Sequence, residues 1–245
     1  MVRPGLVAEP LAAIRAEHGL APDPGLSTLD RGLVLSPFPP SFRSPGNPLP
    51  ATGYPFRLGF SEPAPGERLP RWWPPAPGRP VVYVTLGTEF ALEAGDVFDR
   101  LLAGLGQLPA EVVASVGRER EPAELGPQPR HVHVEQWLPQ SLLLPHTDLV
   151  VSHGGSGTLT AALAHGLPQL VVPMGADQLH NAERVRELGI GRALPAVQAT
   201  PAQIRDAAAA ILADPDTRAA ADRLRREYAA LPDAASTVPL LERLT

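Results

Sequence analysis

The stretch from Trp137 to Gln178 constrains the fold of this chain more than any other part of the sequence. An apolar run, Leu149-Val150-Val151, precedes His153 and the glycine cluster Gly154-Gly155-Ser156-Gly157, and a helix-like pattern begins near Thr158. This order predicts a strand, a tight turn and the N-terminus of a helix. The N–H groups of a first helical turn lack intrahelical partners and lie at the positive end of the helix dipole, so the turn is suited to bind a phosphate.

Residues on either side of the turn add two further kinds of contact. Trp137 precedes it and offers a large flat ring on which a nucleobase can stack. A second apolar strand, Leu170-Val171-Val172, follows it and leads to the hydrogen-bonding pair Asp177-Gln178. The order along the chain therefore predicts contacts to a base, a phosphate and a sugar.

These residues resemble the donor-binding signature of the UDP-glycosyltransferase superfamily, most closely its bacterial macrolide-type branch. The matching positions, in register across 42 residues, are Trp137, Pro139-Gln140, His146, Ser152-His153, Gly155, Gly166, Pro168, Pro173 and Asp177-Gln178. The chain departs from the plant-type pattern at Ala161, where that branch has a glutamate for the ribose hydroxyls, and at Ser156-Gly157. The ribose contact and the identity of the donor therefore stay open at this stage.

The resemblance implies a role for each residue of a donor site. Trp137 is expected to carry the base, with backbone groups near Leu138 reading its edge, and His153 to donate to the diphosphate. The expected donor-binding residues are Thr88, Trp137, Leu138, His153, Gly155, Ser156, Gly157, Thr158, Asp177 and Gln178. The alternatives are structural: a core tryptophan, a histidine bonded to backbone, and helix capping by Ser156, Thr158 or Asp177. We identify no catalytic residue in the chain and expect no metal and no cofactor besides the nucleotide-sugar substrate.

The sequence on both sides of the signature alternates between strand and helix patterns. Strands are predicted at 81–86, 112–116, 132–134, 149–151, 170–172 and 192–194, and helices at 96–107, 178–188, 201–213 and 216–230, with one more from Thr158. Such repeated units predict an α/β fold with a doubly wound, parallel, Rossmann-like sheet over residues 78–231, the C-terminal half of a GT-B fold. Ligands bind beyond the carboxyl ends of such strands, so Gly87-Thr88, the turn 153–158 and the loop 174–178 are expected to converge.

The first part of the chain has a different composition. Of the 31 prolines, 18 lie in residues 1–80, which disfavours long helices and central strands there. We interpret residues 1–77 as a proline-rich strap, the remnant of an N-terminal acceptor domain plus an interdomain linker, and 232–245 as a C-terminal tail or helix. One helix is predicted at 9–18 and one strand at 33–35. The aromatic side chains that either anchor the strap or line an acceptor groove are Phe38, Phe42, Phe60, Trp72 and Trp73.

Composition excludes several classes of function. The chain has no cysteine, a net charge of -5 and no run of Lys and Arg, which argues against disulfides, thiolate metal sites and nucleic-acid binding. It lacks an apolar stretch of about 18 residues and a signal-peptide pattern, so we expect a cytoplasmic protein with no membrane span. His131 and His133 alternate on one predicted strand; the spacing suits a metal pair, but solvated or capping histidines at a sheet edge are favoured.

The function implied by the resemblance is transfer of a hexose from a UDP or TDP sugar to a hydroxyl of a small apolar acceptor, such as a polyketide or lipid, with inversion. Members of the superfamily carry a catalytic histidine in an N-terminal domain, whereas His18 is the only histidine before residue 131 here. We therefore expect the chain to supply the donor-binding half and a missing or separate N-terminal half to supply the base. One alternative is a nucleotide-sugar-binding module without catalysis. A remote one is an NAD-dependent oxidoreductase, which leaves Trp137 and His153 unexplained.

Overall fold

The computed structural model describes residues 4–59, 63, 65–75, 77–87 and 95–244. The chain divides into two compact units, which are described separately. The large unit is Gly59–Ala230, and the small unit joins Met1–Leu58 to Leu231–Thr245. The division at residues 58 and 59 assigns the last part of the predicted strap, residues 59–77, to the large unit.

The large unit contains the predicted parallel sheet. Its strands are β3 (Val81–Thr85), β4 (Glu111–Ser115), β5 (Val132–Glu135), β6 (Leu149–Ser152), β7 (Gln169–Val171) and β8 (Gly191–Ala193). They are hydrogen-bonded in the order β5-β4-β3-β6-β7-β8, and all five neighbouring pairs are parallel. The strand order reverses between β3 and β6, where Thr85 is in register with Ser152. Ligands bind at such a reversal point in doubly wound sheets, so this register locates the site.

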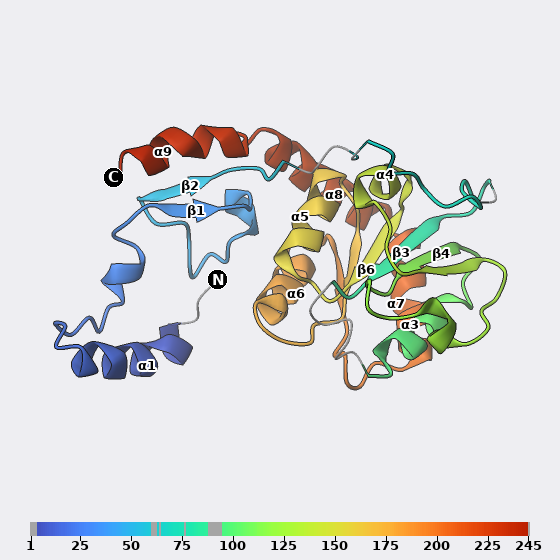
Figure 1. The fold of residues 1–245 in the computed structure, drawn as a ribbon, viewed down its shortest axis with the longest axis horizontal. Coiled ribbons are helices and arrows are strands. Elements are labelled where there is room, and N and C mark those ends of the chain that lie inside the picture. Colours follow the sequence, from blue (N-terminus) through green and yellow to red (C-terminus); the bar gives the residue numbers. More distant parts are fainter. Residues whose placement is uncertain (1–3, 60–62, 64, 76, 88–94, 245) are drawn as a thin grey trace. The chain divides into compact units, whose positions relative to one another are not determined.

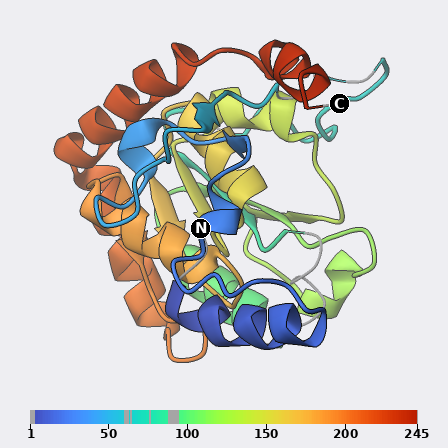
Figure 2. The same ribbon diagram turned by 90° about the vertical axis from the view of Figure 1, so that its left-hand side faces the viewer.

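Helices lie on both faces of this sheet (Figure 1), and the rotated view in Figure 2 also shows the strands between helices. They are α3 (Val97–Leu105), α4 (Gln140–Leu143), α5 (Ser156–Ala164), α6 (Gln178–Glu187), α7 (Pro201–Ala213) and α8 (Pro215–Ala229). The predicted start of α7 is confirmed in detail: Thr200 caps it, its hydroxyl accepting from the Gln203 N–H at 3.3 Å, and Pro201 occupies the first turn.

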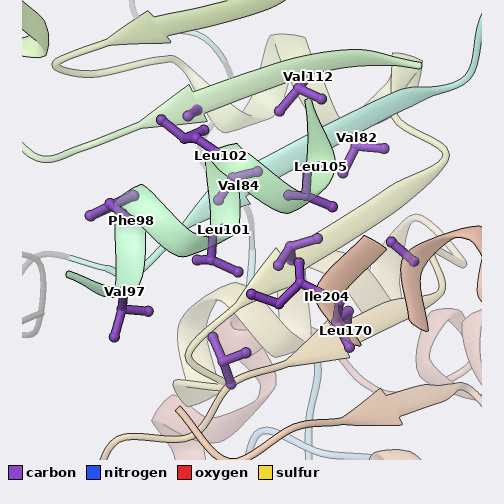
Figure 3. Close-up of a cluster of buried hydrophobic side chains, with 14 of the residues drawn as sticks. Val82, Val84, Val97, Phe98, Leu101, Leu102, Leu105, Val112, Leu170 and Ile204 are labelled. Atoms are coloured by element: carbon purple, nitrogen blue, oxygen red, sulfur yellow. The ribbon is translucent and has the colours of Figure 1, made fainter. Parts of the chain in front are cut away.

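The core of the large unit follows from the alternation of side chains along β3. Val82 and Val84 point to one face, where Phe98 and Leu101 of α3 and Ile204 of α7 cover them (Figure 3). Tyr83 points to the opposite face and packs among residues of α4, α5 and β6. Because both faces are covered, the strand is buried along its whole length, which is why its run of Val and Tyr predicts a buried parallel strand.

Two tryptophans anchor residues 65–75 beside the sheet of this unit. The Trp72 ring stacks on His133 of β5 with ring centroids 3.9 Å apart, and its Nε1–H donates to Glu135 Oε1 at 2.7 Å. Trp73 lies 5.7 Å from the ring of His146. These contacts support the anchoring interpretation of both tryptophans, while Phe60 lies outside the described residues.

The two histidines of the proposed metal pair have separate partners. His133 Nε2 lies 3.4 Å from Glu111 Oε2, under the Trp72 ring, and His131 Nε2 lies 2.9 Å from the carbonyl oxygen of Gly106. Both histidines are half-buried and contact protein groups, His131 just before β5 and His133 within it.

The small unit pairs the start of the chain with its end. It contains α1 (Pro4–Glu17), β1 (Val34–Ser36), β2 (Gly53–Pro55) and α9 (Val238–Glu242), together with short 3-10 turns. Strands β1 and β2 are parallel, and the Arg57 N–H donates to the carbonyl oxygen of Pro232 at 2.8 Å. Phe38 and Phe42 stack with centroids 4.8 Å apart, and Phe42 is buried. Across the described part of the chain, no helix has the length and apolar character needed to cross a bilayer.

Candidate functional site

A cavity of about 450 Å³ opens at the carboxyl ends of β3, β4 and β5. The ends of these strands and the segments that follow them form most of its walls, and α4, α5 and Glu67 contribute most of the rest. The lining residues are Glu67, Tyr83, Thr85, Gly87, Ser115, Gly117, Arg118, Gln136, Trp137, Leu138, Pro139, Gln140, Ser141, Leu144, Ala161 and His165. Predicted site residues Trp137 and Leu138 thus share one cavity, and its position is the one expected for a ligand of a doubly wound sheet.

Trp137 is not a core tryptophan, because 44% of its surface is exposed while the neighbouring Leu138 is buried. The guanidinium carbon of Arg118 lies 5.0 Å from the centroid of the Trp137 ring, a cation–π contact. Arg118 follows Gly117, whose φ of 95° is in the left-handed region. The sequence analysis missed Arg118, since nothing in the spacing of a single arginine after β4 points to Trp137.

The floor of the cavity is polar. Tyr83 and Ser115 are both buried, and their hydroxyl oxygens lie 2.8 Å apart. The side-chain amide of Gln140 donates to Tyr83 Oη at 3.1 Å, which orients this signature residue. Burial raises the pKa of the Tyr83 phenol, so the hydroxyl stays protonated near neutral pH. Ala161 of α5 completes the wall beside this group of hydroxyls.

His153 lies at the end of β6 between two glycines. A Cβ atom placed on Gly155 would lie 2.4 Å from His153 Nε2, and one on Gly87 would lie 2.7 Å from Cε1. Gly87 also has a φ of 74°, in the left-handed region that favours glycine. Both glycines are therefore required to make room for the imidazole. Because Gly87 also lines the cavity, the Trp137 cavity and the His153 turn adjoin at this residue.

The imidazole of His153 is uncharged at neutral pH. Burial lowers its pKa below 6.5, and the nearby carboxylate of Asp177 opposes that shift. A neutral imidazole can still donate one N–H to an anion, and binding an anion beside it favours protonation. The neutral imidazole of His153 can therefore donate a hydrogen bond to a phosphate, and it is protonated more easily once the phosphate is bound.

This shift predicts how stability depends on pH. At pH values between the lowered pKa of His153 in the folded chain and 6.5, the imidazole is protonated to a greater extent in the unfolded chain than in the folded one. His153 therefore decreases the unfolding free energy as the pH falls through this range. We expect the unfolding free energy of the wild type minus that of a His153→Gln variant to be constant above about pH 7.5 and to decrease below about 6.5. Urea denaturation at several pH values measures this difference. A difference that stays constant down to about pH 5 would contradict the assigned pKa.

Asp177 joins the β6 turn to the loop before α6. Its Oδ2 accepts from the Ser156 hydroxyl at 2.5 Å and from the Asn181 side-chain amide at 3.0 Å, and the same amide donates to the Gly154 carbonyl oxygen at 2.8 Å. Asp177 makes no side-chain cap bond to α6, so helix capping does not explain it. Asn181 is a buried residue that the sequence analysis missed, although its position four residues after Asp177 places both on one helix face.

Gln178 has a structural partner in the same loop. Its side chain is 1% exposed, and Oε1 accepts from the N–H groups of Met174 at 2.7 Å and Gly175 at 3.0 Å. These two bonds close the loop 174–178. The sugar contacts predicted for Asp177 and Gln178 stay a prediction.

The N-terminus of α5 is open to a ligand. Its N-cap residue is Gly155, no side chain caps the helix, and its first turn contains no acidic residue. Ser156, Gly157 and Thr158 form that first turn, and the Ser156 hydroxyl is directed to Asp177 instead of the helix. Thr88, the remaining predicted contact, lies outside the described residues. Apart from Thr88, the predicted residues thus form two adjoining groups, one in the cavity and one at the β6 turn.

Comparison with known proteins matches residues 99–244 to the family described as erythromycin biosynthesis protein CIII-like, C-terminal domain. The curated 4'-demethylrebeccamycin synthase of Lentzea aerocolonigenes is 40% identical over 208 residues, which are 84% of this chain and 48% of that protein. The chain spans about half the length of the curated relatives it matches.

Solved structures of glycosyltransferases are similar to nearly the whole chain. The calicheamicin glycosyltransferase CalG4 has a TM-score of 0.77 and 29% identity, covering 99% of this chain and 60% of CalG4. The spinosyn rhamnosyltransferase SpnG complexed with thymidine diphosphate has a TM-score of 0.75 and 30% identity, covering 94% of this chain and 60% of SpnG. The chain therefore belongs to the family of erythromycin biosynthesis protein CIII-like C-terminal domains, and it corresponds to the C-terminal half of the antibiotic glycosyltransferases with a GT-B fold.

Proposed function

We propose that this chain binds the nucleoside-diphosphate sugar of a hexosyltransferase that glycosylates a hydroxyl of a small apolar acceptor with inversion. One observation carries the proposal: the exposed Trp137 ring, the His153 turn and the uncapped N-terminus of α5 adjoin at the carboxyl edge of the sheet. A stacking ring next to a helix N-terminus suits a base linked to a diphosphate.

In this proposal the diphosphate lies at the first turn of α5. The N–H groups of residues 156–158 and the imidazole of His153 donate to its oxygens, and the helix dipole stabilises its charge. As the bond between the sugar and the phosphate breaks, negative charge grows on the leaving diphosphate, and these fixed donors stabilise it without reorganising. We propose that this arrangement works without a metal ion.

The sugar would lie near Asp177, because Ser156 and Asn181 hold that carboxylate between α5 and α6. A carboxylate fixed by two hydrogen bonds can accept from a sugar hydroxyl without losing rotamer entropy on binding. Fixing the sugar in this way orients its anomeric carbon toward the acceptor.

Two observations favour thymidine diphosphate as the nucleotide. Ala161 presents a methyl group to the cavity where the plant-type pattern has a carboxylate for ribose hydroxyls, and a deoxyribose needs fewer acceptors. A similar solved enzyme, SpnG, holds thymidine diphosphate. The proton of the acceptor hydroxyl would be taken by a group outside this donor site, on the N-terminal half of the enzyme.

Calorimetric titration of the purified chain with thymidine diphosphate, UDP and NAD tests the donor site. We expect saturable binding of a pyrimidine diphosphate, tighter for thymidine diphosphate, and none of NAD. The variant His153→Ala is expected to bind about ten times more weakly, because a hydrogen bond to a charged group is lost. His18→Ala, which removes an exposed histidine of the small unit, is the matched control. Binding of NAD alone, or no effect of His153→Ala, would refute the proposal.

Catalysis needs a separate measurement, because a binding module without activity has the same donor site. Combining the chain with an N-terminal half of a related enzyme and an apolar acceptor alcohol, then measuring transfer against donor hydrolysis, separates the two functions. Transfer that depends on His153 supports the transferase, and nucleotide binding with no transfer supports the binding module.

A further inference from the structure

Trp72 is held at a defined place beside β5 of the large unit. The Trp72 ring stacks on His133, and its N–H bonds Glu135, so two kinds of contact fix the ring at the β5 edge. Below the ring, the buried carboxylate of Glu111 lies 3.4 Å from His133 Nε2 and 3.5 Å from an Arg79 guanidinium nitrogen. This cluster makes Trp72 a fixed point from which the preceding residues extend.

Glu67 lies five residues before Trp72 and lines the same cavity as Trp137. An extended chain covers at most about 3.5 Å per residue, so the Trp72 anchor restricts Glu67 to within about 18 Å. The residue is half-buried. Glu67 lies outside the glycosyltransferase signature and thus contributes a carboxylate to the wall of the proposed nucleotide site.

Glu67 brings a carboxylate to this wall. Among the described residues that line the cavity, it is the only acidic one, and Arg118 on the Trp137 ring is the only arginine or lysine. Ala161, on α5, supplies no acceptor. A pyrimidine nucleoside presents N–H and O–H donors to such a wall: the N3–H of thymine or uracil and the hydroxyls of the sugar. A carboxylate accepts from either of them more strongly than a neutral oxygen does.

We propose that Glu67 is a specificity-determining residue of the donor site, whose carboxylate accepts a hydrogen bond from the nucleoside part of the donor. The inference rests on the proposed function. It assigns to residue 67, in the segment before the sheet, a share in donor recognition.

The test compares Glu67→Gln with the wild type by calorimetric titration with thymidine diphosphate. The substitution keeps the size of the side chain and removes its charge, so we expect affinity to fall about tenfold. Glu119→Gln is the matched control, because Glu119 is exposed and does not line the cavity. Its affinity is expected to match that of the wild type. Unchanged or tighter binding by Glu67→Gln would overturn the inference.

Two further nucleotides identify the group that Glu67 accepts from. CDP lacks the N3–H, so if the base is the donor, the wild type prefers UDP to CDP and Glu67→Gln loses that preference. If the sugar 3′-hydroxyl, which all three nucleotides carry, is the donor, Glu67→Gln weakens all three by the same factor and keeps the ratio of UDP to CDP. Either result supports a contact to the nucleoside. A general loss of structure would instead lower the melting temperature of Glu67→Gln, which thermal unfolding measures.

The outcome separates this inference from the proposed function. A wild-type chain that binds none of the pyrimidine diphosphates contradicts both. The role of Glu67 alone is contradicted by a different set of results. In that set the wild type binds thymidine diphosphate, His153→Ala binds it more weakly, and a folded Glu67→Gln binds it as the wild type does.

Discussion

Replacing Trp137 by alanine is expected to weaken the binding of thymidine diphosphate by about 10- to 100-fold, because stacking of one base on an aromatic ring contributes about 1–3 kcal/mol. The ring is 44% exposed, so the variant is expected to unfold with nearly the wild-type free energy. Calorimetric titration measures the affinity and urea denaturation measures the stability. The combination of a large loss of affinity with a small loss of stability distinguishes a binding platform from a packing residue.

Two variants sharpen this experiment. Trp137→Phe keeps a smaller aromatic face and is expected to retain part of the affinity. Trp72→Ala removes a ring that stacks on His133 and packs against buried residues, so it is expected to lower the unfolding free energy by about 2 kcal/mol or more. A Trp137→Ala variant that binds thymidine diphosphate as the wild type does would show that the base lies elsewhere.

A Gly155→Ala substitution is expected to lower the affinity for thymidine diphosphate by about tenfold or more. The new Cβ atom would lie 2.4 Å from His153 Nε2, so the imidazole must leave its position, and the hydrogen bond proposed between it and the diphosphate is then lost. Gly87→Ala is expected to act in the same direction from the other side of the ring, with added backbone strain at a φ of 74°. Titration of both variants, together with the chemical shifts of the His153 ring, measures the displacement.

Gly157→Ala separates this steric effect from a general effect of adding a methyl group to the turn. No heavy atom lies within 4 Å of a Cβ placed there, and the residue lies in the first turn of α5. Alanine favours helix over glycine by up to about 1 kcal/mol, so the chain is expected to become slightly more stable. If Gly155→Ala leaves both the His153 ring and the affinity unchanged, the glycine is not required for the site.

Much of the fold could be predicted from local sequence. Each strand of the six-stranded sheet was expected within a few residues of its observed position, because a strand covered on both faces is a short apolar run between turn residues. The Thr200-Pro201 start of α7 was equally clear, since the capping side chain and the proline act on neighbouring backbone groups. Strands β4, β7 and β8 begin one residue earlier than predicted, because hydrogen bonding to a neighbouring strand decides where each one starts.

The candidate site was predictable only in part. The residues of the signature were expected to meet because the carboxyl ends of parallel strands share one edge, and the structure brings Trp137 and the His153 turn to that edge. The partners Arg118, Asn181 and Glu67 carry no local signal. Each is an ordinary charged or polar residue whose role depends on what another segment places beside it.

The sequence by itself determined the elements of the sheet, the glycine turn and the chemistry gathered in it, because hydrophobic periodicity, capping and glycine geometry act over a few residues. Only the tertiary structure decided which long-range pairs form. It joined Arg57 to Pro232, tied Asp177 to both Ser156 and Asn181, and placed Trp72 over His133. These contacts depend on the path of the backbone between distant residues. That path is fixed by burial of the whole core, so no short stretch of sequence encodes it.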